Sequence, residues 1–162
     1  HVERLKEGVD SWNEWRREND DIAVDLSGAK LEGVDLTIAK LEGANLIRAN
    51  LKGADLLGAK LEGVNLFDAN LERANLTNAK LGGANLTSAN LKRADLFEAN
   101  LERANLRTAK DFRLDGTRIK DSHFSVRATD PWSALRNTYT GPQFTFLLLS
   151  LIAFSLPYIG KI

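Results

Sequence analysis

Cysteine and methionine are both absent from this chain of 162 residues, and only three prolines occur. Without cysteine, the chain forms neither disulfides nor thiolate metal sites. Lysine plus arginine and aspartate plus glutamate both number 22, so no charge excess favours nucleic acid as a partner. Because the sequence starts at His1, with no methionine, we expect it to be an excerpt of a longer chain.

A five-residue period dominates the middle of the sequence. Leucine recurs at every fifth position from Leu26 to Leu106, seventeen times without a miss. Neither a helix nor a strand buries such residues on one face, because a helix advances about 100° per residue and a strand alternates between faces. A chain that coils back on itself buries them all, provided that each coil holds a whole number of five-residue units.

The residue before each leucine indicates how many units make one coil. Sorted at a spacing of twenty, these residues separate into four columns of distinct composition. One is asparagine throughout, at 45, 65, 85 and 105, and a second is asparagine at 50, 70 and 90. The residues after leucine also alternate in sign in one column (Glu32, Lys52, Glu72 and Lys92), as neighbours about 4.8 Å apart should. The sequence therefore predicts four units per coil.

The other two columns are candidate ion sites. Stacked carboxylates could hold cations, although short side chains of this kind more often bond to nearby backbone; this column contains Asp35, Asp55 and Asp95. Stacked ammonium groups could contact phosphate or anionic lipid, and a solvated face is the alternative; this column contains Lys40, Lys60 and Lys80. The sequence leaves these alternatives open.

The repeated unit A(N/D/K)LXX, as in Ala69-Asn70-Leu71-Glu72-Arg73, resembles the pentapeptide-repeat family over about residues 24–126. The resemblance implies an all-β solenoid, a right-handed quadrilateral β-helix of about five coils. It also implies that the central leucine and the small residue two before it point inward. Glycines cluster in two columns, which fits turns with positive φ: Gly33, Gly53, Gly43, Gly63 and Gly83.

Both ends of such a coil need covering, because open backbone and apolar core invite aggregation. Residues 1–22 carry apolar side chains at helical spacing from Val2 to Trp12, and we expect this helix to cap the first coil through Trp12 and Trp15. At the other end the repeat slips in phase after Lys110. We therefore expect an irregular last coil within a β-helix domain of residues 23–126.

Four apolar residues stand at outward positions of the repeat. Ile47 and Phe67 share one outward column, and Leu57 and Phe97 share another. A strip of apolar side chains on a rigid rod favours a surface for a protein partner, and ordinary surface variation is the alternative.

The sequence offers little for chemistry. No phosphate loop, nucleophile elbow or metal-ligand spacing occurs. His123 stands beside Phe124 in the last repeat, and we interpret it as an ordinary outward residue. We therefore predict no enzyme activity, catalytic residue, cofactor or metal.

The C-terminal sequence is apolar. Residues 127–141 predict a linker with an interfacial helix, and residues 142–160 form an uncharged run near the lower limit for a membrane span, for which about 20 residues are typical. Aromatic residues at its margins suit a membrane interface: Trp132, Tyr139 and Tyr158. An apolar helix that covers the coil or a dimer interface is the alternative.

Charge placement predicts the orientation. Lys120, Arg127 and Arg136 precede the apolar run and only Lys161 follows it. By the positive-inside rule, the repeat domain then faces the cytoplasm. The lack of a signal-peptide pattern at the N-terminus agrees with this expectation.

These observations favour a non-enzymatic, membrane-tethered scaffold whose cytoplasmic rod binds an unknown protein partner, with homo-oligomers also open. One alternative is the regulatory domain of a larger multi-span channel or transporter. Another is topoisomerase protection by DNA mimicry, which some family members perform and which implies a strongly acidic surface. Residues 24–110 contain 12 basic and 11 acidic side chains, so this alternative is disfavoured and no nucleic acid is expected.

Overall fold

The computed structural model describes residues 1–110. The altered repeats from 111 to 126, the linker and the apolar segment of residues 142–160 lie outside the described residues. So do His123 and the three expected interfacial aromatics, Trp132, Tyr139 and Tyr158. Within residues 1–110, no helix is both long and apolar enough to span a bilayer.

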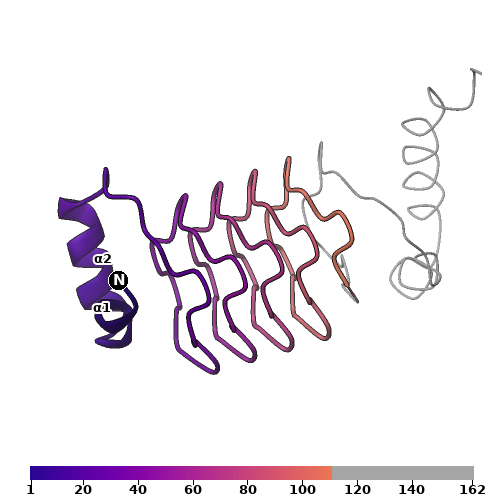
Figure 1. Ribbon diagram of the computed structural model, residues 1–162, viewed down its shortest axis with the longest axis horizontal. Helices are drawn as coiled ribbons and strands as arrows, with labels where there is room; N and C mark the ends of the chain where they lie inside the picture. Colours follow the sequence, from indigo (N-terminus) through magenta and orange to yellow (C-terminus); the bar gives the residue numbers. More distant parts are fainter. Residues whose placement is uncertain (111–162) are drawn as a thin grey trace, which may run out of the picture. The chain divides into compact units, whose positions relative to one another are not determined.

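The repeats form a β-helix with twenty residues per coil. Parallel bridges join each residue before a leucine to the residue twenty positions later, from Asp25 and Asn45 to Asn90 and Lys110. Successive coils stack in Figure 1 as nearly identical turns of the chain. Because the offset is twenty at every bridge, four five-residue units make one coil, as the columns of the sequence predict.

Each unit consists of a short ladder and a turn. Asn65 donates its N–H to Ala44 O at 2.9 Å and accepts at its carbonyl from Leu46 N at 2.8 Å. The turn after Leu46 closes when Ala49 N donates to Leu46 O at 3.0 Å. One turn per five residues bends the chain four times per coil, which gives the coil four sides.

We name each side after one outward residue. The sides are the Phe67 side (25–28, 45–48, 65–68, 85–88, 105–108), the Glu72 side (30–33, 50–53, 70–73, 90–93), the Phe97 side (35–38, 55–58, 75–78, 95–98) and the Lys60 side (40–43, 60–63, 80–83, 100–103). The Phe67 and Phe97 sides are half a coil apart and therefore lie on opposite sides of the rod.

The interior is filled by leucine and alanine. Every repeat leucine from Leu26 to Leu106 is at most 3% exposed, and Ala74 is 1% exposed. This confirms that both the leucine and the small residue two before it point inward. Burial of each leucine contributes about 1.5 to 3 kcal/mol, so the regular leucines dominate the stability of the coil.

Positive φ occurs in every unit and is not confined to the two glycine-rich columns. Each turn has φ between 55° and 68° at its third residue, from Gly28 to Thr108, and ten of these residues are not glycine. A type II turn requires positive φ at this position, and glycine adopts it without steric cost. Ile38 (φ 56°) and Thr108 (φ 55°) are the most strained, because β-branched side chains rarely adopt this conformation.

The N-terminal segment forms two helices where the sequence predicts one. Helix α1 (Val2–Lys6) and helix α2 (Val9–Glu18) are separated at Gly8, whose φ of 119° interrupts the helical backbone. Both helices contribute to the core, since Leu5 is 1% and Trp12 is 0% exposed.

Candidate functional site

Helix α2 covers the first coil on the Lys60 side. The Trp12 indole N–H donates to Lys40 O at 2.8 Å. Asn13 binds two backbone groups at once, because its amide donates to Ile38 O at 3.2 Å and its oxygen accepts from Lys40 N at 2.8 Å. In the next coil the corresponding group, Lys60 N, bonds to Ala39 O. Trp12 and Asn13 thus replace the missing preceding coil at this edge.

Trp15, the second expected capping residue, lies beside Trp12 with ring centroids 5.2 Å apart. It is partly buried against the core. Arg16 is 7% exposed, and its guanidinium donates to Asn19 O and Ile22 O at 2.8 and 3.0 Å. This arginine ties the end of α2 to the chain that enters the first coil.

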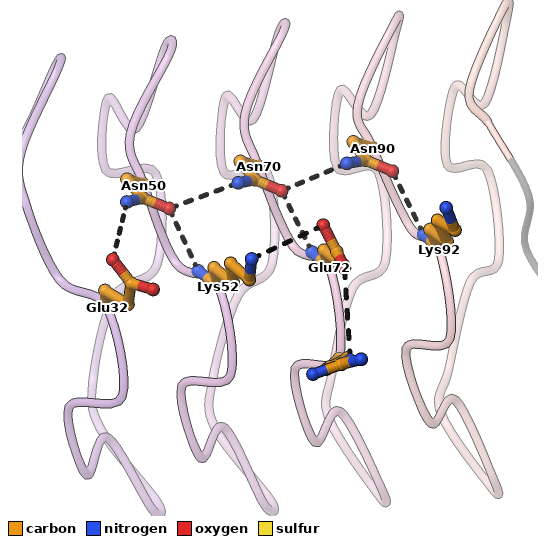
Figure 2. Close-up of polar contacts among 8 residues, drawn as sticks. Glu32, Asn50, Lys52, Asn70, Glu72, Asn90 and Lys92 are labelled. Carbon is orange, nitrogen blue, oxygen red and sulfur yellow. Dashed lines mark hydrogen bonds and ion pairs between the residues drawn. The ribbon is translucent and has the colours of Figure 1, made fainter.

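Asparagine ladders run along the Glu72 side. Asn70 donates to Asn50 Oδ1 at 3.3 Å, and Asn90 donates to Asn70 Oδ1 at 3.1 Å. Each oxygen also accepts the backbone N–H two residues on, as Asn70 Oδ1 does from Glu72 N at 3.1 Å. Figure 2 shows these bonds crossing three successive coils. The asparagine side chains therefore join successive coils by hydrogen bonds, as the backbone does.

The aspartates of the Phe97 side also bond to backbone. Asp35 accepts from Thr37 N at 2.9 Å and Asp55 from Leu57 N at 3.1 Å. The N–H of Thr37 holds the pKa of Asp35 below its ordinary value. Residues 1–110 contain no group of three or more acidic or histidine side chains that could hold a metal ion. Asp35, Asp55 and Asp95 thus act as turn acceptors.

The lysines of the Lys60 side stack in successive coils. Parallel bridges join Lys40 to Lys60 and Lys60 to Lys80. Lys40 and Lys60 are half-buried, and Lys80 is exposed. Glu42 and Glu62 follow in the same coils, so the side as a whole carries both charges. This mixture of charges favours a solvated face.

The four expected partner residues occupy two opposite sides. Phe67 is 37% exposed and lies one coil from the half-buried Ile47 on the Phe67 side. Leu57 (37%) and Phe97 (51%) are on the Phe97 side, with Thr77 in the coil between them. The structure thus separates these residues into two patches.

Sequence reasoning missed Ile38, which at 59% has the highest exposure among the large apolar residues of the described chain. It is adjacent to Leu57, since Ile38 N donates to Leu57 O at 2.8 Å. The signal was available, because Ile38 occupies the turn position that is glycine in neighbouring units.

An ion pair flanks the apolar residues of the Phe67 side. Arg48 Nε lies 3.4 Å from Asp68 Oδ2, one coil apart, and the side chains are 71% and 49% exposed. Both residues occupy the positive-φ position of their turns. The side therefore combines an apolar centre with charges of both signs at its margin.

The geometry defines a β-helical solenoid of five-residue units with a helical cap. A model of the pentapeptide repeats matches residues 29–68 and 69–107 in eight copies. The chain is 34% identical to a pentapeptide repeat protein from Nostoc PCC 7120, covering 69% of this chain and 95% of that one, with a TM-score of 0.58. It is 30% identical to one from the thylakoid lumen of Arabidopsis thaliana, covering 71% and 79%, with a TM-score of 0.55.

The chain belongs to the pentapeptide-repeat family. Its structural neighbours form right-handed quadrilateral β-helices, and the expected architecture of residues 24–110 is thereby confirmed. Members of the family are in general structural or interaction proteins without enzyme activity. A comparison with curated proteins finds no match.

Proposed function

We propose that this protein is a non-enzymatic scaffold whose rod binds a protein partner, and that residues 142–160 tether it to a membrane with the rod in the cytoplasm. The observation that carries the first part is the exposure of Phe67, at 37%, beside the ion pair of Arg48 and Asp68. Interface centres are enriched in aromatic residues and arginine, with polar residues at the rim.

The rigidity of the rod supports this proposal. Backbone bonds join every pair of successive coils, as when Arg48 N donates to Phe67 O at 2.9 Å. A side chain such as Phe67 is therefore held at a fixed position before binding, and a preorganised surface loses less conformational entropy on association.

Site-specific photo-crosslinking in the native cell tests partner binding. A photoreactive residue at position 67 is expected to capture one defined protein, which a second substitution, Asp68→Arg, reduces. The same photoreactive residue at position 72, on the neighbouring side, serves as the matched control. Equal capture from positions 67 and 72, or capture unaffected by Asp68→Arg, contradicts the proposal.

Membrane tethering has its own test. The uncharged composition of residues 142–160 supports it, because such a run has no polar face to present to water. We expect the full chain to remain in the membrane pellet after alkaline extraction and Leu148→Arg to move it into the supernatant. Thr77→Arg, a charge added to the rod, is the control. Release of the unmodified chain contradicts membrane tethering and does not affect the proposal that the Phe67 side binds a partner.

A further inference from the structure

We propose that the partner of the Phe67 side is a second copy of this chain, with the two rods antiparallel. This inference rests on the proposed function, because it names the occupant of the surface proposed there. It follows from the order in which apolar, charged and small residues succeed one another along that side.

Two of the three outward columns of the Phe67 side carry this order, and the third holds Asp25 and the asparagines at 45, 65, 85 and 105. In the first four coils, the residues after leucine place two apolar side chains between two small polar ones (Ser27, Ile47, Phe67 and Thr87), and Arg107 follows in the fifth coil. The next column is in positive φ and places two opposite charges between two small residues in the same four coils (Gly28, Arg48, Asp68 and Ser88), and Thr108 follows in the fifth coil. Within the first four coils both columns therefore have the same centre, which lies between the coils of Ile47 and Phe67.

A two-fold axis along the strand direction through this centre makes the side complementary to itself. It reverses the order of coils and retains each column, so Ile47 faces Phe67 of the second copy. In the next column Arg48 faces Asp68 of the second copy. Two apolar contacts and two ion pairs form by symmetry, as an isologous interface requires. At the ends, Ser27 and Gly28 face Thr87 and Ser88 of the second copy.

The ion pair of Arg48 and Asp68 leaves both side chains accessible to a second copy. Arg48 and Asp68 lie 3.4 Å apart within one chain, yet their side chains remain 71% and 49% exposed. In the dimer, four charges of alternating sign would lie along one edge of the apolar centre. Parallel rods would instead bring each coil against the same coil of the second copy, so that Phe67 meets Phe67 and like charges share a coil.

The other sides lack this combination. Under the same operation on the Phe97 side, Asp35 approaches Asp95 of the second copy. On the Lys60 side, Lys60 approaches Lys80 of the second copy. The Glu72 side pairs opposite charges but offers no large apolar residue among its described outward positions, and exposed ion pairs alone contribute about 0 to 1 kcal/mol.

The size of the side sets the expected strength. Four coils and one strand width give a footprint of roughly 20 by 10 Å. Interfaces that bury less than about 1,200 Å² in total are weak and transient. We therefore expect a dimer that dissociates on dilution, whose formation a membrane tether would favour by concentrating the rods.

Charge reversal tests the pairing directly. Sedimentation of the full chain in mild detergent is expected to show a concentration-dependent dimer. Arg48→Asp alone and Asp68→Arg alone each bring like charges together and are expected to weaken dimerisation at least about tenfold. An equimolar mixture of the two variants restores both ion pairs in a heterodimer, so association is expected to return.

Two further variants locate and orient the interface. Phe67→Ser is expected to weaken the dimer, and Phe97→Ser on the opposite side is the matched control. Because the chain has no cysteine, a mixture of Ser27→Cys and Thr87→Cys chains reports orientation. Antiparallel rods give the mixed disulfide in preference to Ser27→Cys homodimers, and parallel rods give the reverse.

Each remaining outcome overturns the inference. These outcomes are a monomer at all concentrations, a dimer unaffected by either reversal, and a mixture that stays dissociated. Thermal unfolding of each variant verifies that the rod is intact. A different protein captured at position 67 without any dimer overturns this inference and leaves the proposed function standing.

Discussion

The indole N–H of Trp12 donates to the carbonyl of Lys40 at 2.8 Å, across 28 residues of sequence. Its neighbour Asn13 bonds to Lys40 N, so a single helical turn satisfies both backbone groups of one residue in the first coil. An uncovered β-helix end would expose these groups as an edge for other chains. Helix α2 therefore completes the hydrogen bonding of the β-helix at this end, because its side chains bond to the backbone groups that a preceding coil would otherwise occupy.

We expect loss of this cap to destabilise the protein. Trp12→Phe keeps an aromatic ring and leaves Lys40 O without its donor, which should lower the free energy of unfolding by about 1 to 3 kcal/mol. Trp15→Phe is the control, since Trp15 meets Trp12 through ring contacts. Urea unfolding measures both. Equal losses for the two variants would show that aromatic packing, and not the hydrogen bond, closes the coil.

Substitution of the adjacent residues Gly82 and Gly83 tests the effects of crowding and of backbone strain independently. Gly83 has φ 68° and no atom within 4 Å of an added Cβ, while a Cβ at Gly82 would lie 3.8 Å from Glu102 O, an ordinary contact. Gly83→Ala should therefore destabilise the protein by about 1 to 2 kcal/mol through positive φ alone. Gly82→Ala should change stability by less than about 0.5 kcal/mol. Thermal or urea unfolding of this pair is the measurement, and a reversed order would refute the turn assignment.

The small inward position is expected to reject larger residues. Ala74 is 1% exposed between the leucine layers, so Ala74→Leu should cost about 1 to 3 kcal/mol through overpacking. Thr77→Leu adds a similar side chain at an outward position of the same unit and should be nearly neutral. Urea unfolding distinguishes the two, and tolerance of Ala74→Leu would mean that the interior holds unfilled space.

Periodicity predicted the coil because burial repeats with the sequence. Leucines at five-residue intervals and four columns at twenty determine which residues stack, and the backbone bonds of Asn65 to Ala44 and Leu46 in the preceding coil follow directly. Positive φ at Arg48 was not predictable from residue type, because the turn is imposed by the coil and overrides the preference of the residue. The hydrogen bonding of Asn13 to Lys40 was also not predicted. It depends on the rotation of α2 about its axis, which the backbone conformation at Gly8 determines.

The Phe97 side contains a point where the side-chain ladder can be extended. Asn75 donates to Asp55 Oδ1 at 2.9 Å, but Asp55 and Asp35, bridged in successive coils, are both acceptors. Asp55→Asn supplies a donor toward Asp35 and keeps the oxygen that Leu57 N and Asn75 use, so we expect about 0.5 to 1.5 kcal/mol of added stability.

Asp35→Asn is the matched control for that gain. It removes the same pair of like charges but places its new amide at the start of the ladder, away from Asp55. If both variants raise the unfolding midpoint in urea equally, relief of charge repulsion explains the gain and the proposed hydrogen bond does not.

Acid stability should depend on Asp25 at the start of the Phe67 side. The N–H of Ser27 donates to its carboxylate at 3.0 Å, and this bond, with a further one from the Asn45 amide at 3.1 Å, lowers the pKa of Asp25 below 3.8. A carboxyl with a lowered folded pKa stabilises the protein above its unfolded pKa, and this contribution disappears as the pH falls through the folded pKa. The wild-type chain should therefore lose part of its stability between about pH 5 and pH 2.

Asp25→Asn retains the acceptor oxygen and removes the titration. The difference in free energy of unfolding between the wild-type chain and Asp25→Asn is expected to shrink as the pH falls across that window, and to be constant above it. Urea unfolding at pH 7, 5 and 3 measures this difference, and NMR titration of the Asp25 carboxyl carbon reports its pKa independently. A midpoint at or above 3.8, or a difference that grows on acidification, would show that the Ser27 bond does not favour the charged form.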